Sequence, residues 1–225
     1  MRFRCLLFDL DGTLVDTRAD LTTAVNLMLG DLGLERLTCE FVVSLVGEGA
    51  ARLVGRALTA SLGREHTDEE LRQGLDLFKR HYRDHLLDAT RPYDGVPFTL
   101  EHFSRLPRAV VTNKPLEFTE GVLAGLGLRH HFAAVLGGDS LPERKPSAAP
   151  LLEAARLCGV GAAGCLMVGD SMVDIQAGRA AGMMTCGFVG GFRGRGELEA
   201  AGADYLIEHF GELRRVVEGS SGEEG

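Results

Sequence analysis

The sequence of 225 residues contains no tryptophan, only three tyrosines and only five cysteines. The cysteines are scattered, odd in number and never spaced CxxC: Cys5, Cys39, Cys158, Cys165 and Cys186. This pattern excludes a disulfide framework and a cysteine-based zinc site. We interpret the five residues as reduced thiols and expect a cytoplasmic protein.

Long apolar runs are also missing. No stretch approaches the roughly 20 apolar residues of a membrane span. The apolar run near the amino terminus is broken by Asp9 and Asp11, which argues against a signal peptide. Acidic residues exceed basic ones by 32 to 24, giving a formal net charge of −8, which makes general nucleic-acid binding unfavourable. We therefore expect a globular monomer or homodimer that binds neither membranes nor nucleic acids.

Lysine is the scarcest charged residue. Of the 24 basic residues only Lys79, Lys114 and Lys145 are lysines, and the others are arginines. The two side chains are not interchangeable, because an ammonium is a compact charge and a guanidinium is a planar fork. Lys114 and Lys145 both lie in motif segments described below. Lys145 is a candidate for chemistry, whereas a solvated helix face for Lys79 and a loop position for Lys114 are the default interpretations.

Short apolar segments alternate with segments of helical spacing over most of the chain. The expected strands cover 3–9, 109–112, 133–137, 165–169 and 185–189, with 203–207 as a sixth, and the expected helices cover 96–106, 116–126, 147–158 and 172–182. Such alternation is typical of βαβ units. The sequence therefore predicts an α/β fold, with a parallel-sheet, Rossmann-like core covered by helices on both faces.

Residues 17–90 interrupt this alternation, because they contain no convincing strand. Leu21, Val25, Met28 and neighbouring apolar residues have the spacing of an amphipathic helix, and Thr67 to Glu70 fits a capping box that opens another. We expect 1–16 and 91–225 to form the α/β core and 17–90 to form an inserted helical cap domain. The end of the chain, 219–225, contains only Gly, Ser and Glu and is predicted to be a disordered tail.

Polar residues cluster where the predicted strands end. They are Asp9, Asp11, Thr112, Asn113, Lys145, Asp170 and Asp174. The carboxyl ends of parallel strands lie side by side, so these residues are expected to share one crevice. Four carboxylates repel one another unless a cation neutralises them, and an oxygen-only donor set without histidine favours Mg²⁺. The metal ion, the ammonium of Lys145 and the hydroxyl of Thr112 together predict a site for a phosphoryl group.

The spacing of Asp9 and Asp11 suits two-step phosphoryl transfer. A carboxylate can attack phosphorus and form an acyl phosphate, which divides one difficult step into two. Asp9 ends its predicted strand and is the better fixed of the two, so it suits the nucleophile. Asp11 in the following turn could protonate the leaving group and then activate water.

The motifs DLDGT at 9–13, VTNK at 111–114, Lys145 and GDSMVD at 169–174 resemble the four motifs of the haloacid dehalogenase-like phosphatases. The resemblance spans essentially the whole chain and includes the family's helical cap. It implies that Asp9 is the nucleophile and Asp11 the general acid and base, with Thr112 and its neighbour Asn113 on the substrate phosphate. It also implies that the magnesium site uses Asp9, the backbone carbonyl of Asp11, and Asp170, with Asp174 binding directly or through its shell.

Further segments resemble the branch of that family that hydrolyses 2-phosphoglycolate, among them VGEGAARLV at 46–54 and TNKPLEFT at 112–119. For this substrate Arg52 is a candidate to grip the carboxylate, although a surface position is an equally good interpretation. The alternatives are a phosphosugar or nucleotide phosphatase and a sugar phosphomutase. Asp11 argues against a dehalogenase or a phosphonate hydrolase, and the presence of both Asp9 and Asp11 argues against a non-catalytic binding module.

Overall fold

The computed structural model describes residues 2–219. The strands are β1 (Cys5–Phe8), β2 (Val15–Asp16), β3 (Arg91–Pro92), β4 (Arg108–Val111), β5 (Ala134–Leu136), β6 (Cys165–Gly169), β7 (Met184–Phe188) and β8 (Tyr205–Ile207). The α-helices are α1 (Arg18–Asp31), α2 (Cys39–Ser44), α3 (Ala50–Leu62), α4 (Asp68–Asp84), α5 (Val96–His102), α6 (Leu116–Gly125), α7 (Ala149–Leu157), α8 (Met172–Ala180), α9 (Arg195–Ala200) and α10 (Leu213–Glu218).

Six strands form one parallel sheet in the order β5-β4-β1-β6-β7-β8. The first strand, β1, lies in the interior of the sheet, where Leu7 faces Ala109 on one side and Met167 on the other. All residues of β1, β4 and β6 are buried, as expected for strands covered on both faces. The predicted α/β, Rossmann-like fold is confirmed.

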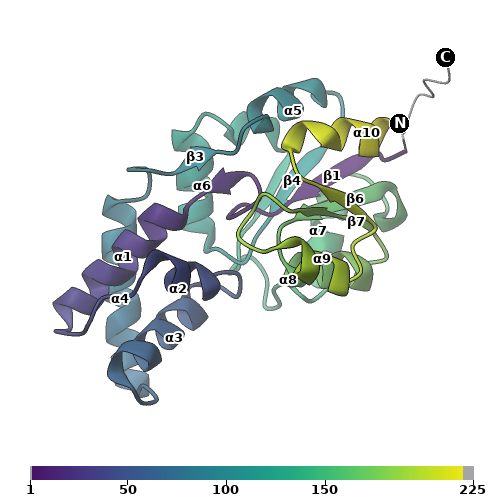
Figure 1. Ribbon diagram of the computed structural model, residues 1–225. Helices are drawn as coiled ribbons and strands as arrows, with labels where there is room; N and C mark the ends of the chain where they lie inside the picture. Colours follow the sequence, from purple (N-terminus) through teal and green to yellow (C-terminus); the bar gives the residue numbers. More distant parts are fainter. Residues whose placement is uncertain (1, 220–225) are drawn as a thin grey trace.

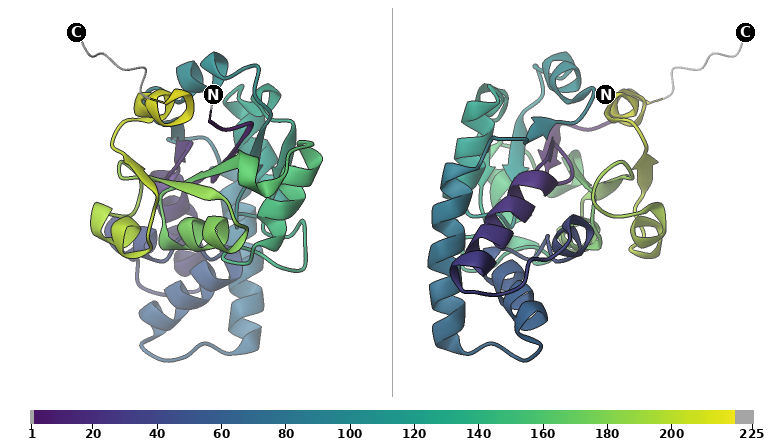
Figure 2. Two further views of the ribbon diagram at one scale, coloured as in Figure 1. Left: turned by 90° about the vertical axis from the view of Figure 1, so that its right-hand side faces the viewer. Right: turned by 60° about the vertical axis from the view of Figure 1, so that its left-hand side comes forward.

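Helices cover both faces of the sheet (Figures 1 and 2). On one face α5, α6 and α10 pack against Phe8, Val110 and Val168, and Phe8 contacts Phe132 and Phe210 at centroid distances of 6.3 and 6.0 Å. On the other face α7 and α8 pack against Leu7 and Met167. The side chains of each strand therefore alternate between two separate cores.

Helices α1 to α4 form a third core beside the sheet (Figure 1). Its centre includes Met28, Val54 and Phe78, all of them buried. The predicted capping box opens α4: Thr67 Oγ1 accepts a hydrogen bond from the Glu70 amide, and Glu70 Oε2 accepts one from the Thr67 amide at 2.7 Å. The two helices predicted at 21–28 and after Thr67 are present as α1 and α4, and α2 and α3 lie between them.

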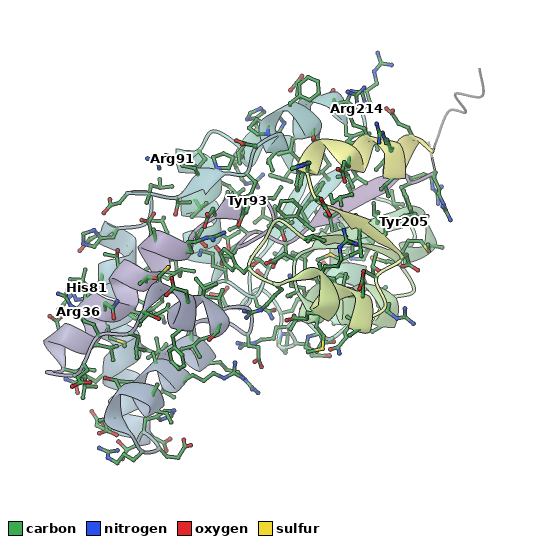
Figure 3. All side chains as sticks on the ribbon, in the orientation of Figure 1. Arg36, His81, Arg91, Tyr93, Tyr205 and Arg214 are labelled. Atoms are coloured by element: carbon green, nitrogen blue, oxygen red, sulfur yellow. The ribbon has the colours of Figure 1, made fainter. Side chains whose placement is uncertain are left out.

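The chain leaves the sheet and returns to it at one place. The short strands β2 and β3, which the sequence analysis did not predict, pair antiparallel with Asp16 opposite Arg91. The buried carboxylate of Asp20 accepts hydrogen bonds from the amides of Ala89 and Thr90 and from the Thr90 hydroxyl. Figure 3 shows Arg91 and Tyr93 at this junction. This arrangement supports our proposal that 17–90 form a cap domain inserted into a core of 1–16 and 91–225.

Two further predictions concern the chain ends and membranes. Of the predicted tail only Gly219 belongs to the part that the structure describes, and 220–225 lie outside it. Within residues 2–219 no helix is both long and apolar enough to cross a membrane.

Candidate active site

Three polar residues of the site lie directly after three neighbouring strands. Asp9 directly follows β1, Thr112 directly follows β4 and Asp170 directly follows β6. Because β4, β1 and β6 are adjacent and parallel, these three residues lie at one edge of the sheet. The Asp9 amide donates a hydrogen bond to the Val168 carbonyl at 3.0 Å, which continues the sheet one residue beyond β1. The prediction that the strand ends bring these residues together is confirmed.

Lys145 reaches the same edge from the segment between β5 and α7. Its Nζ lies 3.0 Å from Asp9 Oδ1 and 2.7 Å from Asp174 Oδ1, and its side chain is 2% exposed. Asp174 lies in the first turn of α8, where its Oδ2 accepts hydrogen bonds from the hydroxyl and the amide of Ser171. The ammonium therefore sits between two fixed carboxylates.

Asp170 is fixed by the two loops around it. Its Oδ1 accepts a hydrogen bond from the Thr13 hydroxyl at 3.3 Å, and its Oδ2 accepts one from the Phe192 amide at 2.7 Å. Gly12 makes the approach possible: its φ is +83°, and a Cβ there would lie 2.2 Å from Asp170 Oδ2. Only glycine satisfies both the left-handed conformation and this close contact.

The acidic groups of the site outnumber the ammonium groups. Oxygens of Asp9, Asp170 and Asp174 lie within 4.8 Å of one another, and all three residues are buried. Asp9 Oδ1 is buried without a hydrogen bond to any described residue, because the nearby Lys145 ammonium provides a close charge and not an aligned donor. A divalent cation with oxygen ligands would satisfy this atom and neutralise the cluster. The residues present therefore fit Mg²⁺.

The pKa values of two carboxyl groups reflect this crowding. Burial raises the pKa of Asp9 to about 6, against the opposing attraction of Lys145 and with a further increase from the charge of Asp174. Burial and the charges of Asp174 and Asp9 raise the pKa of Asp170 well above its ordinary value. Lys145 keeps a raised pKa despite its burial because Asp174 and Asp9 attract its proton. In the absence of a metal ion, ionising the whole cluster is unfavourable.

Asp11 is held on the other side of Asp9 by a second ammonium. Its Oδ1 accepts hydrogen bonds from Thr17 Oγ1 at 2.8 Å and from Lys114 Nζ at 2.9 Å, and its Oδ2 lies 3.1 Å from the same ammonium. Lys114 Nζ also donates to the hydroxyl of Tyr82 on α4 at 2.6 Å. Lys114 lies in the loop between β4 and α6, as expected, but its side chain is only 4% exposed and is part of the site.

The side chain of Asn113 forms hydrogen bonds to backbone groups from two other segments of the site. Its Oδ1 accepts a hydrogen bond from the Lys145 amide, and its Nδ2 donates to the Lys145 carbonyl and to the Gly47 carbonyl of the helical segment. The side chain thus fixes the backbone that carries Lys145 and joins it to the α2–α3 connection. These bonds occupy the amide group that the sequence analysis assigned to the substrate.

These groups open onto a pocket between the sheet and helices α1 to α4. Asp9, Asp11, Thr112 and Asp170 line the polar end of this pocket. Its remaining wall is largely apolar and is formed mainly by Leu21, Val46, Leu53, Phe78, Tyr82 and Phe118. A small polar group could bind at one end while apolar side chains exclude water at the other.

Two arginines differ from what the sequence analysis expected: Arg52 lies outside the pocket, and Arg193 lines it. Arg52, the predicted carboxylate ligand, does not line this pocket within residues 2–219; its side chain is 63% exposed and pairs with Glu48 at 3.0 Å. The geometry gives no support to a substrate role for Arg52, which stays a prediction. Arg193, which the sequence analysis did not single out, lines the pocket and donates hydrogen bonds to the carbonyls of Val43, Ser44 and Val46. No motif marks Arg193, because its partners are backbone atoms about 150 residues away.

The family model for haloacid dehalogenase-like hydrolases matches residues 6–188, a span that contains Asp9, Asp11, Thr112, Lys145, Asp170 and Asp174. The chain belongs to the haloacid dehalogenase-like hydrolase family. It is 43% identical to the phosphoglycolate phosphatase of Neisseria gonorrhoeae over 191 residues, covering 84% of this chain and 81% of that protein. It is 40% identical to the phosphoglycolate phosphatase of Chromobacterium violaceum over 93% of this chain and 94% of that protein.

Solved structures agree with this assignment. A predicted phosphoglycolate phosphatase from Haemophilus somnus superposes with a TM-score of 0.91 and 32% identity, covering 96% of this chain and 99% of that one. A putative phosphoglycolate phosphatase from Lactobacillus delbrueckii gives a TM-score of 0.88 with 30% identity over 96% and 99% of the two chains. Membership of this family and its phosphatase relatives identify the chain as a hydrolase, and more narrowly as a phosphatase.

Proposed function

We propose that this phosphatase hydrolyses 2-phosphoglycolate to glycolate and phosphate through a phosphoaspartyl intermediate on Asp9. The observation that carries the proposal is the position of Asp9: buried at the polar end of the pocket, with Lys145 3.0 Å from one of its oxygens and Asp11 on the same loop. A nucleophile needs to be fixed and kept ionised, and the neighbouring ammonium favours its charged form.

The reaction then follows from the two carboxyl groups. An oxygen of Asp9 attacks phosphorus, and the bond from phosphorus to the ester oxygen breaks while Asp11 gives that oxygen a proton. Asp11, now ionised, takes a proton from a water molecule, whose oxygen attacks phosphorus and releases Asp9. Lys145 holds the Asp9 carboxylate in place and balances the negative charge of the phosphoryl oxygens. The Thr112 hydroxyl lies in the lining beside them.

Mg²⁺ fits the acidic cluster at this end of the pocket. We propose that Asp9 and Asp170 and the backbone carbonyl of Asp11 hold it, with Asp174 in contact or one shell away. When bound, the ion would neutralise the carboxylates and withdraw charge from the phosphoryl group. Asp174 is already engaged with Lys145 and Ser171, which favours a supporting position.

The lining of the pocket favours a small substrate with few hydroxyl groups. Beyond the carboxylates the wall is largely apolar, so it offers few hydrogen-bond partners to a sugar or a nucleoside. The phosphoglycolate phosphatases among the relatives point the same way. A phosphosugar or nucleotide phosphatase and a phosphomutase are the alternatives that this wall disfavours.

One experiment tests both parts of the proposal. With Mg²⁺, we expect kcat/KM for 2-phosphoglycolate to exceed that for glucose 6-phosphate and AMP by ~100-fold or more, since a buried site that pairs a substrate charge discriminates strongly against ligands that lack it. Acid-quenched enzyme should contain a phosphorylated peptide that includes Asp9. Asp9→Asn should remain folded by circular dichroism, lose turnover and lose the phosphopeptide. Turnover retained in Asp9→Asn, or a sugar phosphate preferred over 2-phosphoglycolate, would contradict the proposal.

A further inference from the structure

Lys114 occupies an unusual environment for a lysine. Its ammonium is buried in the pocket wall, paired with both oxygens of Asp11 and with the hydroxyl of Tyr82, and it lies 4.5 Å from the centre of the Tyr82 ring. Tyr82 is itself fixed by stacking on Phe78 at 5.5 Å and by an edge contact with Phe118 at 5.0 Å. The ring and the carboxylate hold the ammonium in one place.

A buried ammonium is stable only while it has an anionic or strongly polar partner. In this structure that partner is Asp11, the group that meets the leaving oxygen in the proposed reaction. In 2-phosphoglycolate one methylene separates the leaving oxygen from the carboxylate. A substrate whose leaving oxygen lies at Asp11 therefore brings its carboxylate close to a cation only 2.9 Å from Asp11.

The other cations of the site are committed elsewhere. Among the pocket-lining residues of the described chain, Arg193 is the other cation, and it donates three hydrogen bonds to the carbonyls of Val43, Ser44 and Val46 and lies 3.9 Å from Glu197. Lys145 lies beneath the pocket between Asp9 and Asp174. Arg52 is on the cap surface. Lys114 alone combines a position in the wall with an exchangeable carboxylate partner.

We infer that Lys114 is the specificity residue that binds the carboxylate of the substrate, by exchanging Asp11 for that carboxylate. The inference rests on the proposed function. One carboxylate replaces another, so the ammonium remains paired before and after binding. Asp11, released from the ammonium, takes up a proton from solvent and then faces the leaving oxygen as the acid that protonates it. A phosphoester without a carboxylate offers no replacement partner, and breaking the Lys114–Asp11 pair for it is unfavourable.

Binding of two non-hydrolysable ligands separates recognition from catalysis. 3-Phosphonopropionate has the length and charges of 2-phosphoglycolate, and propylphosphonate lacks only the carboxylate. By calorimetry on the Mg²⁺-loaded protein, we expect the first to bind roughly 30-fold more tightly, since a charge-assisted pair in a buried site is strong. In Lys114→Met this ratio should fall below about threefold. Lys79→Met removes a lysine from the exposed face of α4 and should keep the wild-type ratio.

A second variant makes the exchange itself testable and does not depend on Lys114→Met being folded. Asp11→Asn removes the competing carboxylate, so the preference for 3-phosphonopropionate should increase. The inference would be overturned if the ratio of the two affinities were unchanged in Lys114→Met or did not increase in Asp11→Asn. Neither result would contradict 2-phosphoglycolate as the proposed substrate. A wild-type protein that does not distinguish the two ligands would instead overturn the proposed substrate, and the inference with it.

Discussion

Gly12 combines a left-handed backbone conformation with a close approach of the backbone to Asp170 in the acidic cluster. In Gly12→Ala a methyl group would meet Asp170 Oδ2 at 2.2 Å in a backbone conformation with a φ of +83°. We expect a loss of about 1–3 kcal/mol in the free energy of unfolding and a large loss of kcat/KM, because Asp170 has to move. Urea unfolding and steady-state kinetics measure the two effects.

Gly33→Ala is the matched control for this substitution. Gly33 also has a positive φ, +70°, but nothing lies within 4 Å of the position of its Cβ. This variant should lose stability through backbone strain alone and keep its activity. The explanation for Gly12 fails if the two variants lose activity to the same extent.

We expect the carboxyl group of Asp9 to make the proposed magnesium binding depend on pH. Its pKa is about 6 in the metal-free protein, chiefly because of burial, whereas that of an unfolded aspartate is about 3.9. Between these values the unfolded chain has lost a proton that the folded protein keeps, so metal-free stability should fall as pH rises from ~4 to ~6. We expect the increase in Tm caused by Mg²⁺ to be larger at pH 7.5 than at pH 5.

Differential scanning fluorimetry with Mg²⁺ or EDTA at the two pH values checks this expectation. In Asp9→Asn the metal-free Tm should depend less on pH, because the group with the raised pKa is gone. A Mg²⁺-dependent increase in Tm that is equal at both pH values, or larger at pH 5, would show that Asp9 does not couple protons to the metal.

At the level of elements, the loop between β7 and α9 holds helix α2 through one side chain. Arg193 donates to the carbonyls of Val43, Ser44 and Val46, which belong to the last turn of α2 and the residues after it. The last carbonyls of a helix lack the usual partner four residues on; the Val43 carbonyl also accepts from the Val46 amide, and a cation adds hydrogen bonds and favours the helix dipole. Arg193 therefore joins the end of α2 to the loop after β7 at the wall of the pocket.

Arg193→Gln should loosen this contact. We expect amide hydrogen exchange at 42–49 to accelerate by ~10-fold or more, because several hydrogen bonds at the pocket wall are lost, and kcat/KM for 2-phosphoglycolate to fall. Arg195→Gln is the control, since Arg195 pairs only with Glu199 and Glu208 among the described residues. Equal exchange rates in the two variants would show that Arg193 does not hold the end of α2.

The elements with strong periodicity could be predicted from the sequence. The apolar runs gave each strand of the parallel sheet to within a few residues, because both faces of these strands are buried. The two-residue strands β2 and β3 could not be predicted, because their pairing depends on the chain returning after the cap. The short helices α9 and α10 were also missed, since tertiary packing of Leu198, Leu213 and Val217 stabilises them more than local pattern does.

For the molecule as a whole, the antiparallel pair of Asp16 and Arg91 offers a test of the proposed cap boundaries. Directly opposed residues of antiparallel strands lie about 5 Å apart at Cα, so a short glycine linker can replace 17–90. We expect this shortened protein to keep the α/β circular dichroism spectrum, to hydrolyse p-nitrophenyl phosphate slowly and to lose activity on 2-phosphoglycolate. The full chain is the control, and an unfolded product would count against the division into core and cap.

The residues that form the site could be predicted from the sequence only where their positions depend on the ends of strands. Asp9, Thr112 and Asp170 directly follow β1, β4 and β6, and Lys145 was expected beside them because it comes shortly after the strand that became β5. The pairing of Lys114 with Asp11 and Tyr82 joins residues from two units of the chain, so no local pattern reports it. The substrate role of Arg52 stays a prediction, and no sequence pattern showed that its side chain would be 63% exposed and paired with Glu48.

The interior position of β1 has a consequence for the order in which the sheet can be completed during translation. Its neighbour β4 is made at Arg108–Val111, but its other neighbour, β6, is made only at Cys165–Gly169. Until then one edge of β1 has no partner, and Asp9 lacks both Asp170 and Asp174 as neighbours. A nascent or truncated chain that stops before β6 therefore contains Asp9 without the rest of the acidic cluster.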